Sequence, residues 1–237
     1  MEEYSILIYG IKITEPLGTL TDLMVTGICL FAFFRLRREK RNDLAFKFFN
    51  YFFLTMAIAT FFGGILGHAF IHAIHFAWKL PGWLTSMLSI SLLERASIKH
   101  AKKYLHPRIA KFYEIANIIE LVVVMVITFS TMDFFWVEMH SGFGLLAVIL
   151  PVQLWTFIKT RNKGSLLFLL GVGVALISAF FFMNKISYNE VVSYLAISHF
   201  FMAIGSYVFF LAARKVISED ILPELKLNTF LTQKDQK

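Results

Sequence analysis

Seven long apolar stretches, separated by short polar connections, dominate this sequence of 237 residues. A helix needs roughly 20 predominantly apolar residues to cross the hydrocarbon core of a bilayer. The apolar runs are continuous rather than alternating, which favours transmembrane helices over transmembrane strands. We therefore expect an all-α bundle of seven membrane-spanning helices, which cover residues 16–36, 47–75, 80–97, 110–131, 135–158, 164–183 and 190–213.

The composition agrees with a polytopic membrane protein. Hydrophobic residues make up 57% of the chain and charged residues only 16%, which lies far from the averages of soluble domains. The net charge of +7 comes from short basic clusters between the apolar stretches, so it indicates membrane topology and not binding of nucleic acid. The N-terminal segment lacks the basic region and cleavage pattern of a signal peptide, and we expect it to be retained.

The Lys and Arg residues predict the orientation, because short basic loops stay on the cytoplasmic side of a membrane. Of the 23 Lys and Arg residues, all but Lys12, Lys79 and Lys185 lie at the connections after the first, third and fifth stretches or in the C-terminal tail. We expect the N-terminus outside and the C-terminus in the cytoplasm, in a multi-pass protein of the inner or plasma membrane. Residues 1–217 then form the seven-helix domain, and residues 218–237 a polar cytoplasmic tail.

Four titratable side chains fall at similar depths in the outer half of the predicted bundle. In the segment "GGILGHAFIHAIH", His68 and His72 are four residues apart, so a regular helix places them on one face, with His75 one turn further. At 1.5 Å per residue, Asp22 lies roughly 10 Å below the outer end of the first helix and His199 about 13 Å below that of the seventh. Ionisable groups inside a bilayer are costly and usually mark a site.

Imidazole and carboxylate groups are the ligands that zinc and similar divalent ions prefer. The sequence therefore predicts a metal site formed by His68, His72, His199 and Asp22, in which Asp22 is a ligand or orients an imidazole. Asp22 and Glu15 are the candidate general bases, and Glu15 also suits the rim of the site. The alternative is that each buried histidine is a packed, hydrogen-bonded side chain without a ligand.

A second set of polar residues lies deeper in the predicted membrane. Glu120 falls near the midplane of the 110–131 stretch, where a carboxyl group is expected to be protonated or paired. Its candidate partners are Glu94, Arg95 and Gln153. His140, near the start of the next stretch, is expected at the outer rim of the metal site.

The layout of seven helices, with His68 near the end of the second and His199 on the seventh, resembles the CREST superfamily of membrane hydrolases, which includes alkaline ceramidases and progestin and adiponectin receptors. That resemblance implies a zinc ion that activates water against a lipid amide or ester. Gly64 stands where the superfamily has a Ser, the third helix has no Asp, and the seventh has one His. The segments "EPLGTLTD" and "GGILGHAF" also resemble bacterial multi-pass proteins of a domain-of-unknown-function family, which implies no activity.

Three functional hypotheses follow. The first is a zinc-dependent hydrolase within the membrane that acts on a lipid amide or ester. The second is an electron-transfer protein in which His68 and His199 are the axial ligands of a haem. The third is a receptor or transport module without enzymatic activity. The expected partners are membrane lipids, one of them a substrate, and the oligomeric state stays open. A retinal protein is disfavoured, because the only lysine of the seventh helix, Lys215, lies at its cytoplasmic end.

Overall fold

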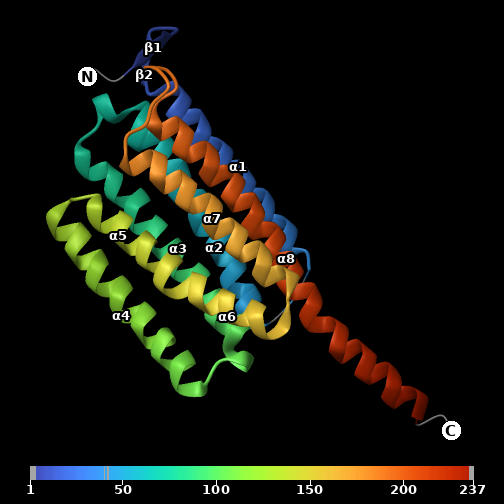
Figure 1. Cartoon of the computed structure of the whole chain (residues 1–237). Helices are drawn as coiled ribbons and strands as arrows, with labels where there is room; N and C mark the ends of the chain where they lie inside the picture. Colours follow the sequence, from blue (N-terminus) through green and yellow to red (C-terminus); the bar gives the residue numbers. More distant parts are fainter. Residues whose placement is uncertain (1–3, 40, 42, 235–237) are drawn as a thin grey trace.

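The computed structural model describes residues 4–39, 41 and 43–234, with the side chains of the last helix described up to Val216. The fold is a helical bundle (Figure 1). Its helices are α1 (Pro16–Arg37), α2 (Leu44–Phe62), α3 (Leu80–Ala101), α4 (Pro107–Thr131), α5 (Phe135–Phe143), α6 (Leu150–Thr160), α7 (Lys163–Met183) and α8 (Tyr194–Lys234). The polar tail expected from residue 218 falls within α8, where its side chains lie outside the described residues.

Two of the expected spans contain a π-helix. The chain passes from α2 directly into the π-helix η1 (Gly63–Ala69), and from α5 into α6 through the π-helix η5 (Gly144–Ile149). Three short 3-10 turns, η2 (Ile71–Ala73), η3 (Phe76–Lys79) and η4 (Lys102–Tyr104), lie in the connections on either side of α3. The expected helix over residues 47–75 therefore ends early, at Ala69.

Six helical segments among the described residues are long and apolar enough to cross a membrane. They are Pro16–Arg37, Leu44–Ala69, Pro107–Thr131, Phe135–Thr160, Lys163–Met183 and Tyr194–Val216. The remaining expected span, residues 80–97, forms most of α3, which has 22 residues but carries many polar side chains. The polar groups of α3 are largely buried, because α3 packs against α2, α4, α5 and α6.

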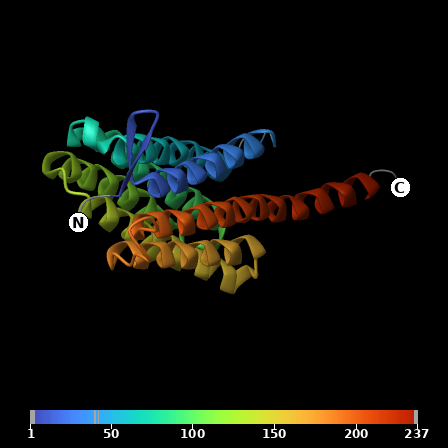
Figure 2. The ribbon, with the colours of Figure 1, turned by 90° about the horizontal axis from the view of Figure 1, so that it is seen from above.

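The helices lie alongside one another, with α4 on the opposite side of the bundle from α1 and α8 (Figures 1 and 2). Close contacts join α8 to both α1 and α7, and join α2 to both α1 and α3. The core is rich in phenylalanine: Phe49 stacks on Phe168 with their ring centroids 5.3 Å apart, and Phe209 lies against Phe168 at 5.6 Å. Interhelical hydrogen bonds add to this packing, such as the one of 2.8 Å between the Thr26 and Thr60 hydroxyls.

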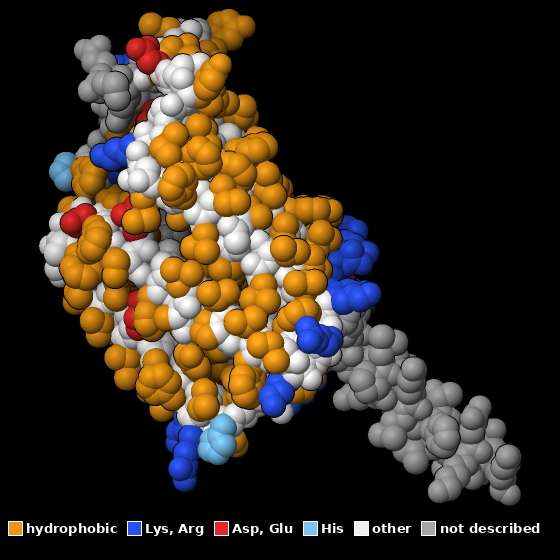
Figure 3. Space-filling model, viewed as in Figure 1, with side chains coloured by type: hydrophobic (Ala, Val, Ile, Leu, Met, Phe, Trp, Pro, Cys, Tyr) orange, Lys and Arg blue, Asp and Glu red, His pale blue; other side chains and the backbone are white. Residues whose placement is uncertain are grey.

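The outer surface of the bundle is apolar. On α4, only Ala110, Asn117 and Thr128 are buried, whereas side chains such as Val126 and Phe129 are exposed. Figure 3 shows hydrophobic side chains along the flank of the bundle, and Lys and Arg side chains gathered toward its lower end. A broad apolar flank with a basic end is typical of a protein that lies in a membrane.

A β-hairpin, which the pattern of long apolar stretches does not predict, precedes α1. Strand β1 (Ser5–Ile8) pairs antiparallel with β2 (Ile11–Thr14), so that Ser5 faces Thr14. The two turn residues, Tyr9 and Gly10, have φ angles of 49° and 82°. Positive φ at both central residues is the requirement of the tightest hairpin turn, and glycine meets it without strain. The hairpin fixes the direction from which the chain enters α1.

The close approach of α7 and α8 depends on Gly164. A Cβ atom at this position would lie 2.5 Å from the backbone nitrogen of Val216 on α8. We predict that Gly164→Ala lowers the free energy of unfolding by about 1–3 kcal/mol, because α8 must shift to relieve the overlap. Unfolding of the detergent-solubilised protein by heat or denaturant measures the change.

Gly173→Ala is the matched control, because a Cβ atom at Gly173, on the same helix, meets nothing within 4 Å. Both variants replace glycine by alanine on α7, and only Gly164→Ala places the added methyl group against α8. Equal stability of the two variants would contradict the predicted packing.

Candidate metal centre

The Asp22 carboxyl group lies at the contact between α1 and η1. The residue is 3% exposed and one of the few buried acidic residues in the described chain. Two glycines of η1 make room for it: a Cβ atom at Gly63 would lie 3.0 Å from Asp22 Oδ2, and one at Gly64 would lie 3.1 Å from Asp22 Cβ. The glycines therefore permit the close approach of η1 to α1, which brings the next turn of η1 to the carboxyl group.

His68, on that next turn, has its two ring nitrogens in different environments. Its Nδ1 lies 2.6 Å from Glu15 Oε2, and because a carboxylate only accepts, Nδ1 donates this hydrogen bond. Its Nε2 faces Asp22 Oδ2 at 3.6 Å, which is too long for a hydrogen bond. The Glu15 carboxylate thus fixes the ring so that Nε2 points toward Asp22.

His199, on α8, approaches Asp22 from the other side. Its Nδ1 lies 3.4 Å from Asp22 Oδ1 and has no hydrogen-bond partner among the described residues. The backbone of Gly18, on α1, accepts a hydrogen bond from the ring. Because Nδ1 makes no hydrogen bond, Nε2 is the nitrogen that donates to Gly18. Each histidine therefore faces the same carboxyl group with one ring nitrogen, while an acceptor binds its other nitrogen.

The spacing of these three side chains suits a small divalent cation. One donor atom from each of Asp22, His68 and His199 lies within 4.8 Å of the other two. A tetrahedral zinc ion with ligands at about 2.0–2.1 Å holds its ligand atoms roughly 3.3–3.4 Å apart, close to the observed 3.4 and 3.6 Å. Hydrogen bonding of the second imidazole nitrogen to a carboxylate or a carbonyl is also typical of metal-ligating histidines.

Glu15 reaches His68 from a strained backbone conformation. It precedes the first residue of α1 with φ at 47° and ψ at 55°, in the left-handed region that residues other than glycine seldom adopt. Its backbone nitrogen donates a 2.8 Å hydrogen bond to the carbonyl of Tyr4, next to β1. The hairpin holds this conformation, and local strain of this kind is frequent at functional sites.

His72 and His75 do not share the face of His68. The prediction of a common face required a regular α-helix. The chain instead forms π-turns from Gly63 onward, and the helix ends at Ala69. His72 lies in a 3-10 turn, where its Nδ1 is 3.0 Å from the Thr14 hydroxyl. The structure therefore places three of the four predicted ligands together and puts His72 against the hairpin.

His140 lies away from the predicted rim. It is completely buried on α5, where its Nδ1 lies 2.8 Å from Glu120 Oε2, and the two residues form a second group with Glu94. Of the other expected partners of Glu120, Arg95 binds Asn117 and Gln153 binds Ser97. The pairing of Glu120 with His140 was not predicted, although α4 and α5 follow each other in the chain and pack together.

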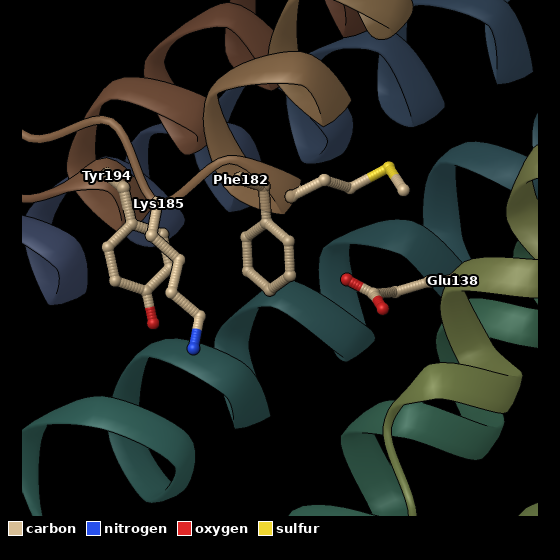
Figure 4. A pocket seen from close by; sticks show the side chains of 5 residues that line it. Glu138, Phe182, Lys185 and Tyr194 are labelled. Carbon is tan, nitrogen blue, oxygen red and sulfur yellow. The ribbon is translucent and has the colours of Figure 1, made fainter.

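A surface cavity of about 210 Å³ lies near the beginning of α8, apart from the candidate metal centre (Figure 4). It is lined by Glu138, Phe182, Met183, Lys185 and Tyr194. None of the three candidate ligands lines it. Their own exposure is small, with 13% of the side-chain surface of both His68 and His199 accessible.

A family profile described as "Family of unknown function (DUF6962)" matches residues 17–218. The match covers Asp22, His68 and His199 and begins two residues after Glu15. The chain matches no curated protein and no solved structure. The resemblance to the CREST superfamily therefore stays a prediction.

Proposed function

We propose that this chain, which belongs to the DUF6962 family of unknown function, is a membrane enzyme that depends on a divalent metal ion. Zinc is the ion that best suits the donor set of two imidazoles and one carboxylate. One observation carries the proposal: His68 and His199 each turn a free ring nitrogen toward Asp22, while their second nitrogens are bound by Glu15 and Gly18.

The donor set favours catalysis over a structural role. Structural zinc sites have four protein ligands, whereas catalytic sites have three and keep a position open for water. Bound there, zinc would supply a water of lowered pKa and polarise a carbonyl group. Asp22, His68 and His199 would hold the ion, and the contact of Glu15 with His68 favours a positioning role over that of general base.

The location of the centre supports a lipid substrate. Asp22 lies six residues into α1, about 9 Å along the helix axis from Pro16, and the surrounding surface is apolar. A substrate that reaches this depth from the side must partition into the bilayer. Together with the resemblance to CREST hydrolases, this supports hydrolysis of a lipid amide or ester.

We propose a seven-span topology in the inner or plasma membrane, with the N-terminus outside. The length of α3 supports a seventh span, since 22 residues rise about 33 Å. The basic side chains Arg35, Arg37 and Lys159 lie in the last turns of α1 and α6, at the end of the bundle expected to face the cytoplasm. The metal centre would then lie in the outer half of the membrane.

The haem hypothesis fits the geometry less well. Axial ligation by His68 and His199 requires a porphyrin between the two imidazoles, but their ring centroids are 5.3 Å apart and Asp22 contacts both. An absorption spectrum of the purified protein tests it, because a bound haem gives a Soret band.

We predict that the protein purified from zinc-supplemented cells holds one zinc ion per chain, and that His68→Ala, His199→Ala and Asp22→Asn each lose it. Elemental analysis of protein in detergent measures the content. His72→Ala is the matched control, because this histidine contacts Thr14 and not Asp22. Absence of zinc from the wild type, or equal loss in His72→Ala, would overturn the proposal.

Glu15→Gln is expected to weaken zinc binding by about 10–100-fold without abolishing it, as is usual when the orienting partner of a metal-bound histidine is changed. The neutral amide is a weaker acceptor for the His68 Nδ1 proton. Competition with a chelator of known affinity measures the change. If Glu15→Gln binds zinc as tightly as the wild type, Glu15 does not orient His68.

Hydrolysis is tested with the full-length protein in nanodiscs that contain a lipid amide or an acyl ester. We expect release of free fatty acid that stops when a chelator removes the metal and returns when zinc is added. His199→Ala should be inactive, and His72→Ala should keep at least half of the wild-type rate. Stoichiometric zinc without hydrolysis of either lipid class would refute the enzymatic part of the proposal and leave the metal site standing.

A further inference from the structure

A second group of ionisable side chains lies between α3, α4 and α5. One donor atom from each of Glu94, Glu120 and His140 lies within 4.8 Å of the other two. Glu94 and His140 have no exposed surface, and 17% of the Glu120 side chain is accessible. Such groups inside a membrane protein are costly and usually functional.

The hydrogen bonds of His140 show where protons must lie. Its Nε2 is 2.8 Å from the carbonyl oxygen of Met87, which can only accept, so Nε2 carries a hydrogen. Its Nδ1 is 2.9 and 2.8 Å from the two carboxyl oxygens of Glu120. A bare nitrogen and a carboxylate would repel each other at this distance. One further proton therefore lies between His140 and Glu120, on one partner or the other.

This arrangement differs from that of the metal centre. His68 and His199 each keep one nitrogen free of hydrogen bonds, whereas both nitrogens of His140 are engaged. A distance of 2.8 Å between Nδ1 and Glu120 Oε2 is also shorter than the roughly 3.3 Å edge of a tetrahedral zinc site. The geometry of this group therefore favours proton binding over metal binding.

Glu94 is the member of the group whose carboxyl group forms no ion pair with a basic side chain among the described residues. Neither of its carboxyl oxygens makes a hydrogen bond of good geometry, although Asn117 lies close enough to interact with it. A Cβ atom at Gly144, the first residue of η5, would lie 2.6 Å from Glu94 Oε1. Because an unpaired buried carboxylate is strongly disfavoured, Glu94 holds a proton in this environment.

The charged groups around Glu94 do not supply a positive charge that would stabilise its carboxylate form. His140 from α5 and Glu120 from α4 already neutralise each other. On α3 itself, the Arg95 guanidinium donates to Asn117 and lies over the ring of Phe48. Glu114 on α4 is bound by Lys99 and Lys102. The remaining packed elements contribute no counter-charge: α2 and α6 carry only Lys47 and Lys159, each near a helix end, and η5 carries none.

We propose that Glu94, Glu120 and His140 form a proton-binding site that is separate from the metal centre. The site holds one proton between His140 and Glu120 and a second on Glu94. Glu120 is the only member with accessible surface, so protons leave and enter there.

Infrared difference spectroscopy of the full-length protein in nanodiscs, recorded between acidic and alkaline pH, tests the proposal. We expect a carbonyl stretching band of a protonated carboxyl group that is lost in Glu94→Gln and shifted in Glu120→Gln. Glu114→Gln is the control and should leave the band unchanged, because Glu114 is partly exposed and paired with lysines. A band that is the same in Glu94→Gln and the wild type would overturn the proposal.

Metal analysis separates this site from a second metal centre. We expect no change of metal content in His140→Gln. A second ion per chain that is lost in His140→Gln would show that the group binds metal, and would refute the proton site. Should Glu94→Gln fail to fold, the absence of any shift in Glu120→Gln is sufficient to overturn the proposal.

Discussion

Burial of the Asp22 carboxyl group is the constraint on which one half of the bundle depends. A charged group in an apolar interior must have polar partners, and here they come from α8, from η1 and, through His68, from the residue that precedes α1. To bring these partners together, η1 presents glycines to α1, and α1 packs against both α2 and α8. The packing of four chain segments is thus organised around one side chain.

The sequence was sufficient for much of the fold and for part of the site. Continuous apolar runs predict helices well, because a spanning segment must satisfy its own backbone hydrogen bonds. The predicted distances of Asp22, His68 and His199 from the ends of their helices are similar, and the structure does place these three side chains together. Such distances are informative because helices that lie side by side have their ends at similar levels. Hydropathy alone is a weaker guide for α3. Many of its polar side chains are buried against other helices, so its composition is less apolar than that of the other long helices.

Other parts of the structure could not be predicted from the spacing of a regular helix, because they depend on local backbone conformation. The grouping of His72 with His68 assumed regular α-turns, and the glycines that begin η1 break this pattern. The hairpin was missed although "SILIYGIKIT" contains two short β-branched runs around a Tyr-Gly turn, the expected signal of such a structure. The pairing of Glu120 with His140 depends on the exact rotation of two helices, which sequence spacing does not determine.

Both π-helices begin with a glycine that lies against a buried carboxyl group, Gly63 at Asp22 and Gly144 at Glu94. A π-turn holds more residues than an α-turn, so the side chains that follow it are rotated relative to those before it. In each of these spans, the side chains after the π-helix therefore point in other directions than a continuous α-helix would give them. A single residue inserted or deleted within "GGILGHA" would change the direction of His68 while leaving the span long enough to cross the membrane. In this chain, the direction of His68 therefore depends on the length of this segment as well as on its residues.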